Sequence, residues 1–239
     1  NKYAKPEAAG LDVNHLALSA LALRVDSFFY SPERLTMGIS KFSFREKCGF
    51  CLSDMSCRVL MDTARLNIPS LSIVTPASRM QAKLAMDLNA FADTLPGSLS
   101  ANLNVRLGFA DMAALLPYMK PYVSRMPYAF IDVKGEMKGN MQKAHVPVFS
   151  LQIPGAMTAR ADGWLQNLTD IDRLKGHMAF AVRTQQIDAI RRVLPAETAA
   201  SFRLPSGMAL DGKVAFDGAL YNVKAQLREG GGNAMAAVS

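Results

Sequence analysis

The sequence predicts an all-β protein, built mainly from antiparallel strands in an elongated sheet, with two short helices. Apolar and polar residues alternate with a period of two along most of the chain. Helical periodicity is confined to two short segments, 111–119 and 186–194. The order of these patterns also repeats along the chain, which is typical of extended structures assembled from similar units.

The first predicted strand covers residues 12–30, and the second covers 35–44. In the second strand the apolar phase holds up to Ile39 and then slips by one residue. A slip of this kind predicts a β-bulge near Ser40-Lys41, because one extra residue moves every later side chain to the other face. Less regular alternation predicts further strands at 50–61, 131–141 and 208–227.

The clearest alternation lies in segments 80–90 and 99–109. Each segment places its apolar residues on one face of a strand and its polar or small residues on the other. The apolar members are Met80, Ala82, Leu84, Met86 and Leu88 in the first segment, and Leu99, Ala101, Leu103, Val105, Leu107 and Phe109 in the second.

The two predicted helices are short and end near prolines. The segment 111–119 has Asp111 as its expected N-cap, and Pro117 and Pro121 must break or end the helix. The segment 186–194 places apolar residues on one side and ends before Pro195.

A shift of 77 residues superimposes two units, approximately 70–147 and 148–226. It places Met80 on Met157 and Gly135 on Gly212, with a one-residue insertion between these points. We therefore expect one β-rich segment, 1–239, with two internal repeats. A compact barrel or sandwich is the alternative architecture. In either case the apolar face must lie against a core, a partner or an apolar ligand.

Cys48 and Cys51 form a Cys-x-x-Cys motif, which in redox proteins opens a helix that activates the first thiol. Here strand-like residues flank the motif and no helical period follows it, so a structural role is favoured. A turn at Gly49-Phe50 would allow a disulfide without requiring one. Cys57 is in phase with Met55, Val59 and Met61 and is predicted to be a small buried apolar residue.

No motif for catalysis, metal binding or phosphate binding occurs, and we expect no enzyme activity, no metal and no cofactor. His15, His145 and His177 are isolated, and no second cysteine pair completes a zinc site. The net charge of +7 is spread along the chain as single residues, which argues against nucleic-acid binding. The stretch Gly230-Gly231-Gly232 is interpreted as a linker or boundary.

No apolar run reaches the roughly 18 residues that a transmembrane helix needs. The chain has no initiator Met and no signal-peptide pattern at Asn1, so we expect a fragment or processed form whose targeting or anchoring segment lies elsewhere. The fourteen methionines fall mostly in the apolar strand phases. They indicate either ordinary core filling or an adaptable apolar surface for flexible ligands.

Four stretches resemble the AsmA-like superfamily and, within it, TamB-type translocation and assembly proteins of the Bacteroidetes type. They are GLDVNHLALSALALRVDSFFY, LTMGISKFSFREKCGF, LNIPSLSIVTPASRMQAKLAMDLNAF and RLPSGMALDGKVAFDGALY. In such proteins a strand of the form LSFKEKSGF commonly precedes another strand, which puts Cys48 at a position usually held by Ser.

The resemblance implies an internal fragment of a periplasm-spanning envelope protein, with a long, curled β-sheet that forms an apolar groove. It implies transport of phospholipids between inner and outer membranes, an inner-membrane anchor, and an Omp85-family outer-membrane partner that binds regions outside this chain. From the alternation, the groove candidates are Leu84, Met86, Leu88, Leu103, Val105, Leu107, Phe180 and Val182. The alternatives are an outer-membrane protein assembly factor acting by β-augmentation and a closed β-sandwich binding module.

Overall fold

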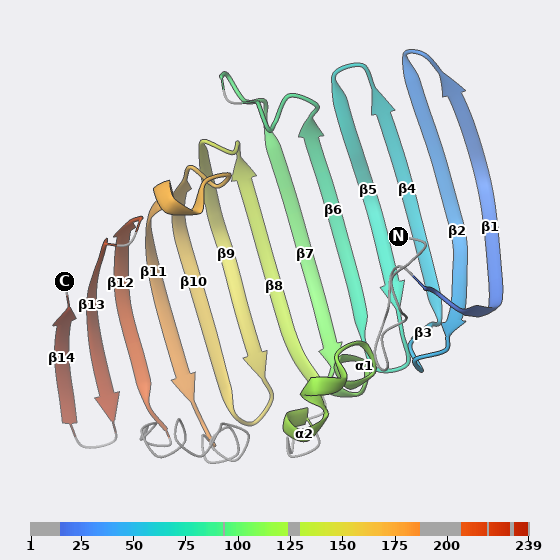
Figure 1. Cartoon of the computed structure of the whole chain (residues 1–239). Coiled ribbons are helices and arrows are strands. Elements are labelled where there is room, and N and C mark those ends of the chain that lie inside the picture. Colours follow the sequence, from blue (N-terminus) through green and yellow to red (C-terminus); the bar gives the residue numbers. More distant parts are fainter. Residues whose placement is uncertain are drawn as a thin grey trace.

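A computed structural model of the chain describes residues 15–92, 94–123, 130–186, 207–218, 220–229 and 232–238. Its strands form one open antiparallel sheet in which strands adjacent in sequence lie side by side, from β1 to β14 (Figure 1). The short β3 is the exception to this path, because it pairs only with β2. The prediction of an all-β, elongated sheet is thus confirmed. The described residues form a single sheet rather than a closed barrel or a sandwich.

The strands are long, as expected for a chain dominated by period-two alternation. They are β1 (Leu18–Ser31), β2 (Arg34–Glu46), β3 (Cys51–Leu52), β4 (Asp54–Asp62), β5 (Arg65–Val74), β6 (Arg79–Asp87), β7 (Leu99–Gly108), β8 (Phe130–Gly139), β9 (Lys143–Ile153), β10 (Met157–Gln166), β11 (Lys175–Thr184), β12 (Ala209–Asp217), β13 (Leu220–Glu229) and β14 (Gly232–Val238). The helical segments are α1 (Phe109–Leu115), η1 (Pro117–Met119), α2 (Lys120–Val123) and η2 (Ile171–Arg173).

The predicted β-bulge in β2 is confirmed. Lys41 pairs with Arg24 and Ile39 pairs with Val25, so Ser40 is the extra residue in β2. A second shift follows at once in β1, where Asp26 is the extra residue. The Ser40 hydroxyl donates a hydrogen bond of 2.7 Å to the Asp26 carboxylate. The two bulged residues therefore satisfy each other, and the apolar phase of β2 continues beyond the bulge.

Two prolines inside the sheet also coincide with shifts of register. Pro69 lies in β5 where the pairing with β6 shifts between Ile68 and Leu71. Pro147 lies in β9 where the pairing with β8 shifts between Val148 and His145. Proline has no N–H to donate to a ladder, so a bulge is the position inside a sheet that tolerates it.

The first predicted helix is present but begins earlier than expected. Its N-cap is Gly108, so Asp111 is not the N-cap and lies inside the first turn of α1. The buried Asp111 carboxylate instead accepts hydrogen bonds from the hydroxyls of Thr75 and Ser78, which fix α1 to the β5–β6 turn. Pro117 ends the helix, as predicted. The second predicted helix, 186–194, lies outside the described residues except for Gln186.

Two other boundaries differ from the expectation. The predicted single strand 208–227 is two strands, β12 and β13, joined by a turn at Gly218 whose φ is 58°. The glycine stretch is not simply a linker, because Gly232 begins β14, which pairs with β13. Glycine allowed this misreading because its lack of a side chain removes the alternation signal.

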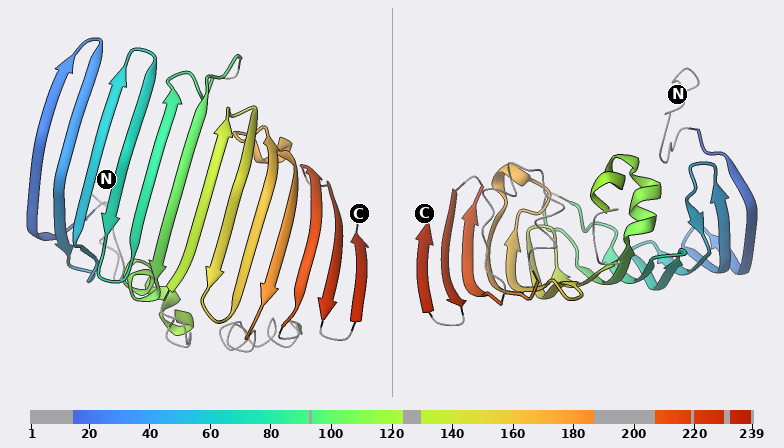
Figure 2. Two further views of the ribbon diagram at one scale, coloured as in Figure 1. Left: turned by 180° about the vertical axis from the view of Figure 1, so that it is seen from behind. Right: turned by 90° about the horizontal axis from the view of Figure 1, so that it is seen from below.

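The sheet is twisted and curved, and α1 and α2 rise from one side of it (Figure 2). Apart from the contact of α1 with β7, the substantial contacts of every described strand are with its neighbours in the sheet. Such an arrangement leaves the sheet as one layer. Stability therefore comes from strand pairing and from side chains packed along each face, not from a core between two layers.

Candidate functional site

The strand register assembles the alternating apolar residues into continuous rows that cross the sheet. Two rows are neighbours on one face, called here the apolar face. One row contains Ile73, Met80, Val105, Val133, Leu151, Ala159, Val182, Leu210 and Leu227. The other contains Leu71, Ala82, Leu103, Gly135, Phe149, Ala161, Phe180, Gly212 and Ala225. No charged or polar side chain interrupts either row.

The rows are long enough for lipid chains. Each crosses nine strands, β5 to β13, and strands lie about 4.8 Å apart, so each row is roughly 38 Å long. One acyl chain spans half of the ~30 Å hydrocarbon core of a bilayer, or about 15 Å. The apolar face can thus hold at least two such chains end to end.

The structure places seven of the eight sequence-predicted groove residues on the strands of this face. They are Leu84, Met86, Leu103, Val105, Leu107, Phe180 and Val182. Leu88 is different, because β6 ends at Asp87 and Leu88 lies in the following turn. Its backbone N–H donates a 2.7 Å hydrogen bond to the Ala64 carbonyl, and its side chain is exposed. Leu88 is therefore not carried by a strand of the apolar face.

The apolar face is not covered by any other layer of the described chain. No large side chain among the described residues is fully buried, and the buried apolar residues are few and lie mostly near strand ends. The side chains of the two rows are mostly half-buried, through contact with their neighbours along the face. An apolar surface of this extent is unusual for a chain that functions without a ligand or partner.

The opposite face carries most of the charge, and ion pairs link adjacent strands on it. The pairs are Arg65–Asp87 (3.1 Å), Arg106–Asp132 (2.8 Å), Lys175–Asp217 (2.8 Å) and Arg183–Asp211 (2.8 Å). Arg106 binds Asp132 through two nitrogens and lies 4.0 Å from the centre of the Phe130 ring. The Asp132 hydrogen bond raises the pKa of Arg106 further. This face is suited to water, which is what a one-sided apolar track requires.

One aromatic cluster stands on the charged face. Trp164 stacks on His145 with 4.5 Å between ring centroids, and the Lys143 ammonium lies 5.0 Å from the Trp164 ring. Both histidines that neighbour Trp164 in the register, His145 and His177, are on this face. Their surroundings are strand residues, as expected.

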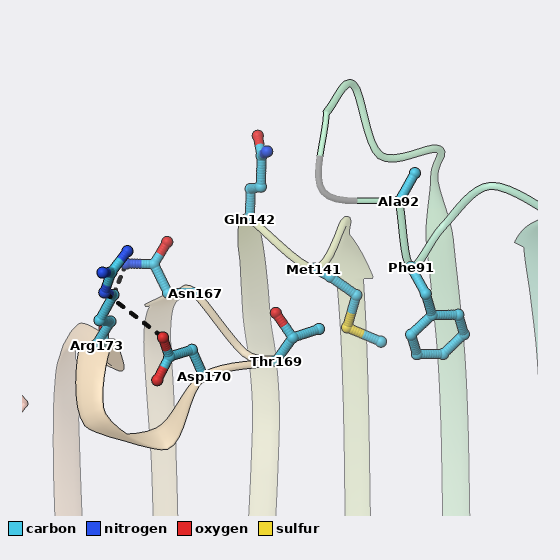
Figure 3. A pocket seen from close by; sticks show the side chains of 8 residues that line it. All are labelled: Phe91, Ala92, Met141, Gln142, Asn167, Thr169, Asp170 and Arg173. Carbon is cyan, nitrogen blue, oxygen red and sulfur yellow. Dashed lines mark hydrogen bonds and ion pairs between the residues drawn. The ribbon is translucent and has the colours of Figure 1, made fainter.

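A hollow of about 600 Å³ lies at the ends of the strands, among the connections that follow β6, β8 and β10 (Figure 3). Its lining is mixed. Phe91 and Met141 are apolar, whereas Arg173 forms a 3.6 Å ion pair with Asp170, and the Asn167 amide donates to the Arg173 carbonyl. The hollow is more polar than the apolar face, and the residues that line it lie outside the strands, in turns and in η2.

The cysteine motif lies at the turn from β2 to β3, and no helix follows it. Cys48 and Cys51 are free, and Gly49 has φ 98°, which only glycine adopts readily. Hydrogen bonds from the Cys48 thiol, and from the backbone N–H groups of Cys48 and Ala17, lower the pKa of Glu46 to about 2. Burial, together with this carboxylate, raises the pKa of Cys48, so the thiolate is disfavoured. The local electrostatics are the reverse of those that activate a redox cysteine.

Among the described residues no group of three or more His, Cys, Asp or Glu side chains could hold a metal ion. Burial also raises the pKa of Cys57, which lies on the apolar face opposite Leu71. No helix in the described part of the chain is long and apolar enough to cross a membrane.

Sequence patterns missed several residues of the apolar face, above all Phe149 and Leu151 in β9. The bulge at Pro147 breaks the alternation of this strand into two short stretches, so its phase could not be read locally. The signal that could have found these residues is the proline itself, because a proline between two alternating stretches marks a bulge and a change of phase.

Comparison with known proteins adds no relative. No model of a known protein family matches the chain, and neither a curated protein nor a solved structure matches it. The described part of the chain defines an open, single-layer β-sheet with one apolar face that no other described layer covers.

Proposed function

We propose that this chain is a lipid-conducting segment of an AsmA/TamB-like envelope protein. In this proposal its apolar face carries phospholipid acyl chains through the periplasm, between the inner and outer membranes, and so supports outer-membrane biogenesis. The observation that carries the proposal is the continuity of the two apolar rows across nine strands, with no covering layer among the described residues. Burial of acyl chains on these rows removes apolar surface from water on both partners, at about 0.8 kcal/mol for each buried methylene.

The chemistry of the face favours an acyl chain over a peptide. Strands β2 and β4 to β13 are paired on both sides, so their backbone groups are already hydrogen-bonded. A peptide lying on the face would bury amide groups without partners, which costs several kcal/mol for each group. An acyl chain has no such groups, and its headgroup can stay in water. An inner-membrane anchor and an Omp85-family partner outside this chain would complete the route.

The test is native mass spectrometry of the gently purified chain, with lipid extraction from the same sample. We expect bound phospholipid that is lost in the double variant Leu103→Asp, Val105→Asp, because two carboxylates on the rows would have to be desolvated by the acyl chain. The control is Ser100→Asp, Asn104→Asp on the other face of β7, where each new carboxylate lies opposite Lys138 or Lys134. A lipid-free wild-type chain, or equal loss in both variants with the fold intact, contradicts the proposal.

A second function has one observation in its favour. Strand β1 lies at one end of the sheet and exposes Leu21, Leu23, Phe28, Phe29 and Tyr30 along a 14-residue edge. A long apolar edge of this kind can template an added strand, so the chain could act as an assembly factor for outer-membrane proteins by β-augmentation. Stoichiometric capture of an unfolded barrel protein by the lipid-free chain, abolished by Leu23→Pro, would favour this function over lipid transport.

A further inference from the structure

One position of the apolar face is an open gap. Gly135 lies in the middle of β8, and among the described residues no heavy atom outside Gly135 and its two chain neighbours comes within 4 Å of the place where a Cβ would be. Its φ is not in the left-handed region, so the backbone does not require glycine. Glycine in the interior of a strand weakens the sheet, and such a glycine often marks the close approach of a ligand.

The side chains beside this gap are unusually exposed. Leu103 on β7 and Phe149 on β9 are the direct cross-strand neighbours of Gly135. They are 38% and 39% exposed. Among the described residues of β2 to β12, no other large side chain on the apolar face reaches 36% exposure. The gap therefore has apolar walls that no part of the described chain covers.

The corresponding position in the second unit is filled. The 77-residue spacing relates Gly135 to Gly212 and Leu103 to Phe180. In the sheet Gly135 pairs directly with Leu103, and Gly212 pairs directly with Phe180. The Phe180 ring lies over Gly212, with its Cζ 2.5 Å and its Cε1 2.9 Å from the place of the missing Cβ. Aromatic rings placed over strand glycines are a known way to restore the lost packing.

A second glycine of the same unit is covered in the same way. The ring of Phe216 on β12 reaches Gly176 on β11, with Cζ 2.6 Å from the place of its Cβ. The second unit thus covers Gly176 and Gly212 with phenylalanine rings, whereas the first unit has Leu103 at the position that corresponds to Phe180.

We propose that the gap at Gly135 is a seat for a phospholipid acyl chain, and that Leu103, in place of a phenylalanine, keeps the seat open. The inference rests on the proposed function and deepens it, because it locates lipid on the first unit and away from Gly212. Phe180 over Gly212 shows, within the same chain, that an apolar group fits over a glycine of this row. The occupant is an alkyl chain because the row around Gly135 offers only apolar side chains and paired backbone.

The experiment exchanges the two residues that differ between the units. The chain is loaded with a phosphatidylethanolamine that carries a diazirine midway along one acyl chain, irradiated, and mapped by peptide mass spectrometry. Leu103→Phe copies the second unit, and Phe180→Leu copies the first. Gly135→Val fills the gap without changing Leu103, and circular dichroism checks the fold of each variant.

We expect the wild type to be labelled mainly on β7, β8 and β9. Labelling there should fall about tenfold in Leu103→Phe and in Gly135→Val, as expected when roughly two methylenes lose their burial. Phe180→Leu should add labelling on β11, β12 and β13. The exchange of both residues should move the label from the first unit to the second.

The possible failures are distinct. Lipid that is bound but labels both units equally, or labelling that ignores Leu103→Phe and Gly135→Val, overturns the seat and leaves lipid transport intact. A wild-type chain that takes no label above the level seen with excess unlabelled lipid overturns both. A stable dimer whose two apolar faces protect each other from labelling also overturns the seat, because the occupant is then a second copy of the chain.

Discussion

Gly135 and Gly212 hold corresponding positions in two units of similar architecture, and their surroundings differ. Strands β6, β7, β8 and β9 of the first unit fall, after a shift of 77 residues, on β10, β11, β12 and β13 of the second. The apolar rows pass through both. In the second unit Phe180 covers its glycine, and in the first unit Leu103 does not. Units with the same fold can thus have different accessible surfaces, because a single side chain decides whether a gap is filled.

The largest expected effect compares charges placed on the two units. Leu103→Asp, Val105→Asp in the first unit should remove nearly all bound phospholipid, because desolvating a carboxylate costs several kcal/mol. Phe180→Asp, Val182→Asp, at the corresponding positions on β11, should retain most of it, because the seat proposed at Gly135 lies in the first unit. Quantitative lipid extraction measures both. Equal losses would mean that the two units bind lipid alike.

Valine at the two glycines should have opposite effects on stability. Gly212→Val forces its side chain against Phe180 Cζ and the Lys224 carbonyl oxygen, 2.5 and 2.7 Å from the place of the Cβ, and overpacking of this kind costs about 1–3 kcal/mol. The Cβ of Gly135→Val has open space among the described residues, and the variant should stabilise the chain by about 0.5–1 kcal/mol, since glycine is a poor strand residue. Urea unfolding of both variants measures the difference. A destabilised Gly135→Val would show that the gap is not open space.

The helical segment of the first unit depends on one carboxylate. Asp111→Ala leaves the hydroxyls of Thr75 and Ser78 without their acceptor in a partly buried site, so the free energy of unfolding should fall by about 1–3 kcal/mol. Asp111→Asn keeps an acceptor oxygen and should lose less. Thermal unfolding compares the two variants. If both variants unfold like the wild type, Asp111 does not anchor the helical segment of the first unit. The corresponding Asp188 lies outside the described residues.

The smallest expected effect concerns the ion pairs on the charged face. Arg106→Gln removes a contact of two guanidinium nitrogens with Asp132, and Arg183→Gln removes a contact of one guanidinium nitrogen with both carboxylate oxygens of Asp211. Both pairs are exposed, so each loss should be at most about 1 kcal/mol, and it should shrink as salt is added. Denaturant unfolding at low and high salt measures this. A larger, salt-insensitive loss at Arg106 alone would assign the effect to its packing on Phe130.

Local patterns predicted the fold class well for a physical reason. In a single-layer sheet with one apolar and one charged face, alternation with period two is present in nearly every strand, and strands pair with their sequence neighbours. Because the alternation of β2 is regular on both sides of Ser40, its slip by one residue also predicted the β-bulge there. The N-terminus of α1 was misplaced because Asp111 has a tertiary role, with Thr75 and Ser78 as its partners, and not a local one.

The candidate face could be predicted only in part. Leu103, Val105 and Val182 follow from alternation alone, but Phe149 and Leu151 lie beyond a proline bulge that hides their phase. Leu88 was assigned to the face because alternation continues past Asp87, where the hydrogen bond of Leu88 to Ala64 belongs to a turn. Periodicity reports side-chain phase and does not report where a strand stops pairing.

The sequence by itself determined that this chain forms strands with one apolar and one polar face, and that its pattern repeats after 77 residues. Each of these properties is carried by residues close together along the chain, or by simple recurrence. Only the tertiary structure decided that the strands form one open layer, and that Gly212 is covered whereas Gly135 is not. Those outcomes depend on the register between strands and on the reach of individual side chains across them, which no local pattern encodes.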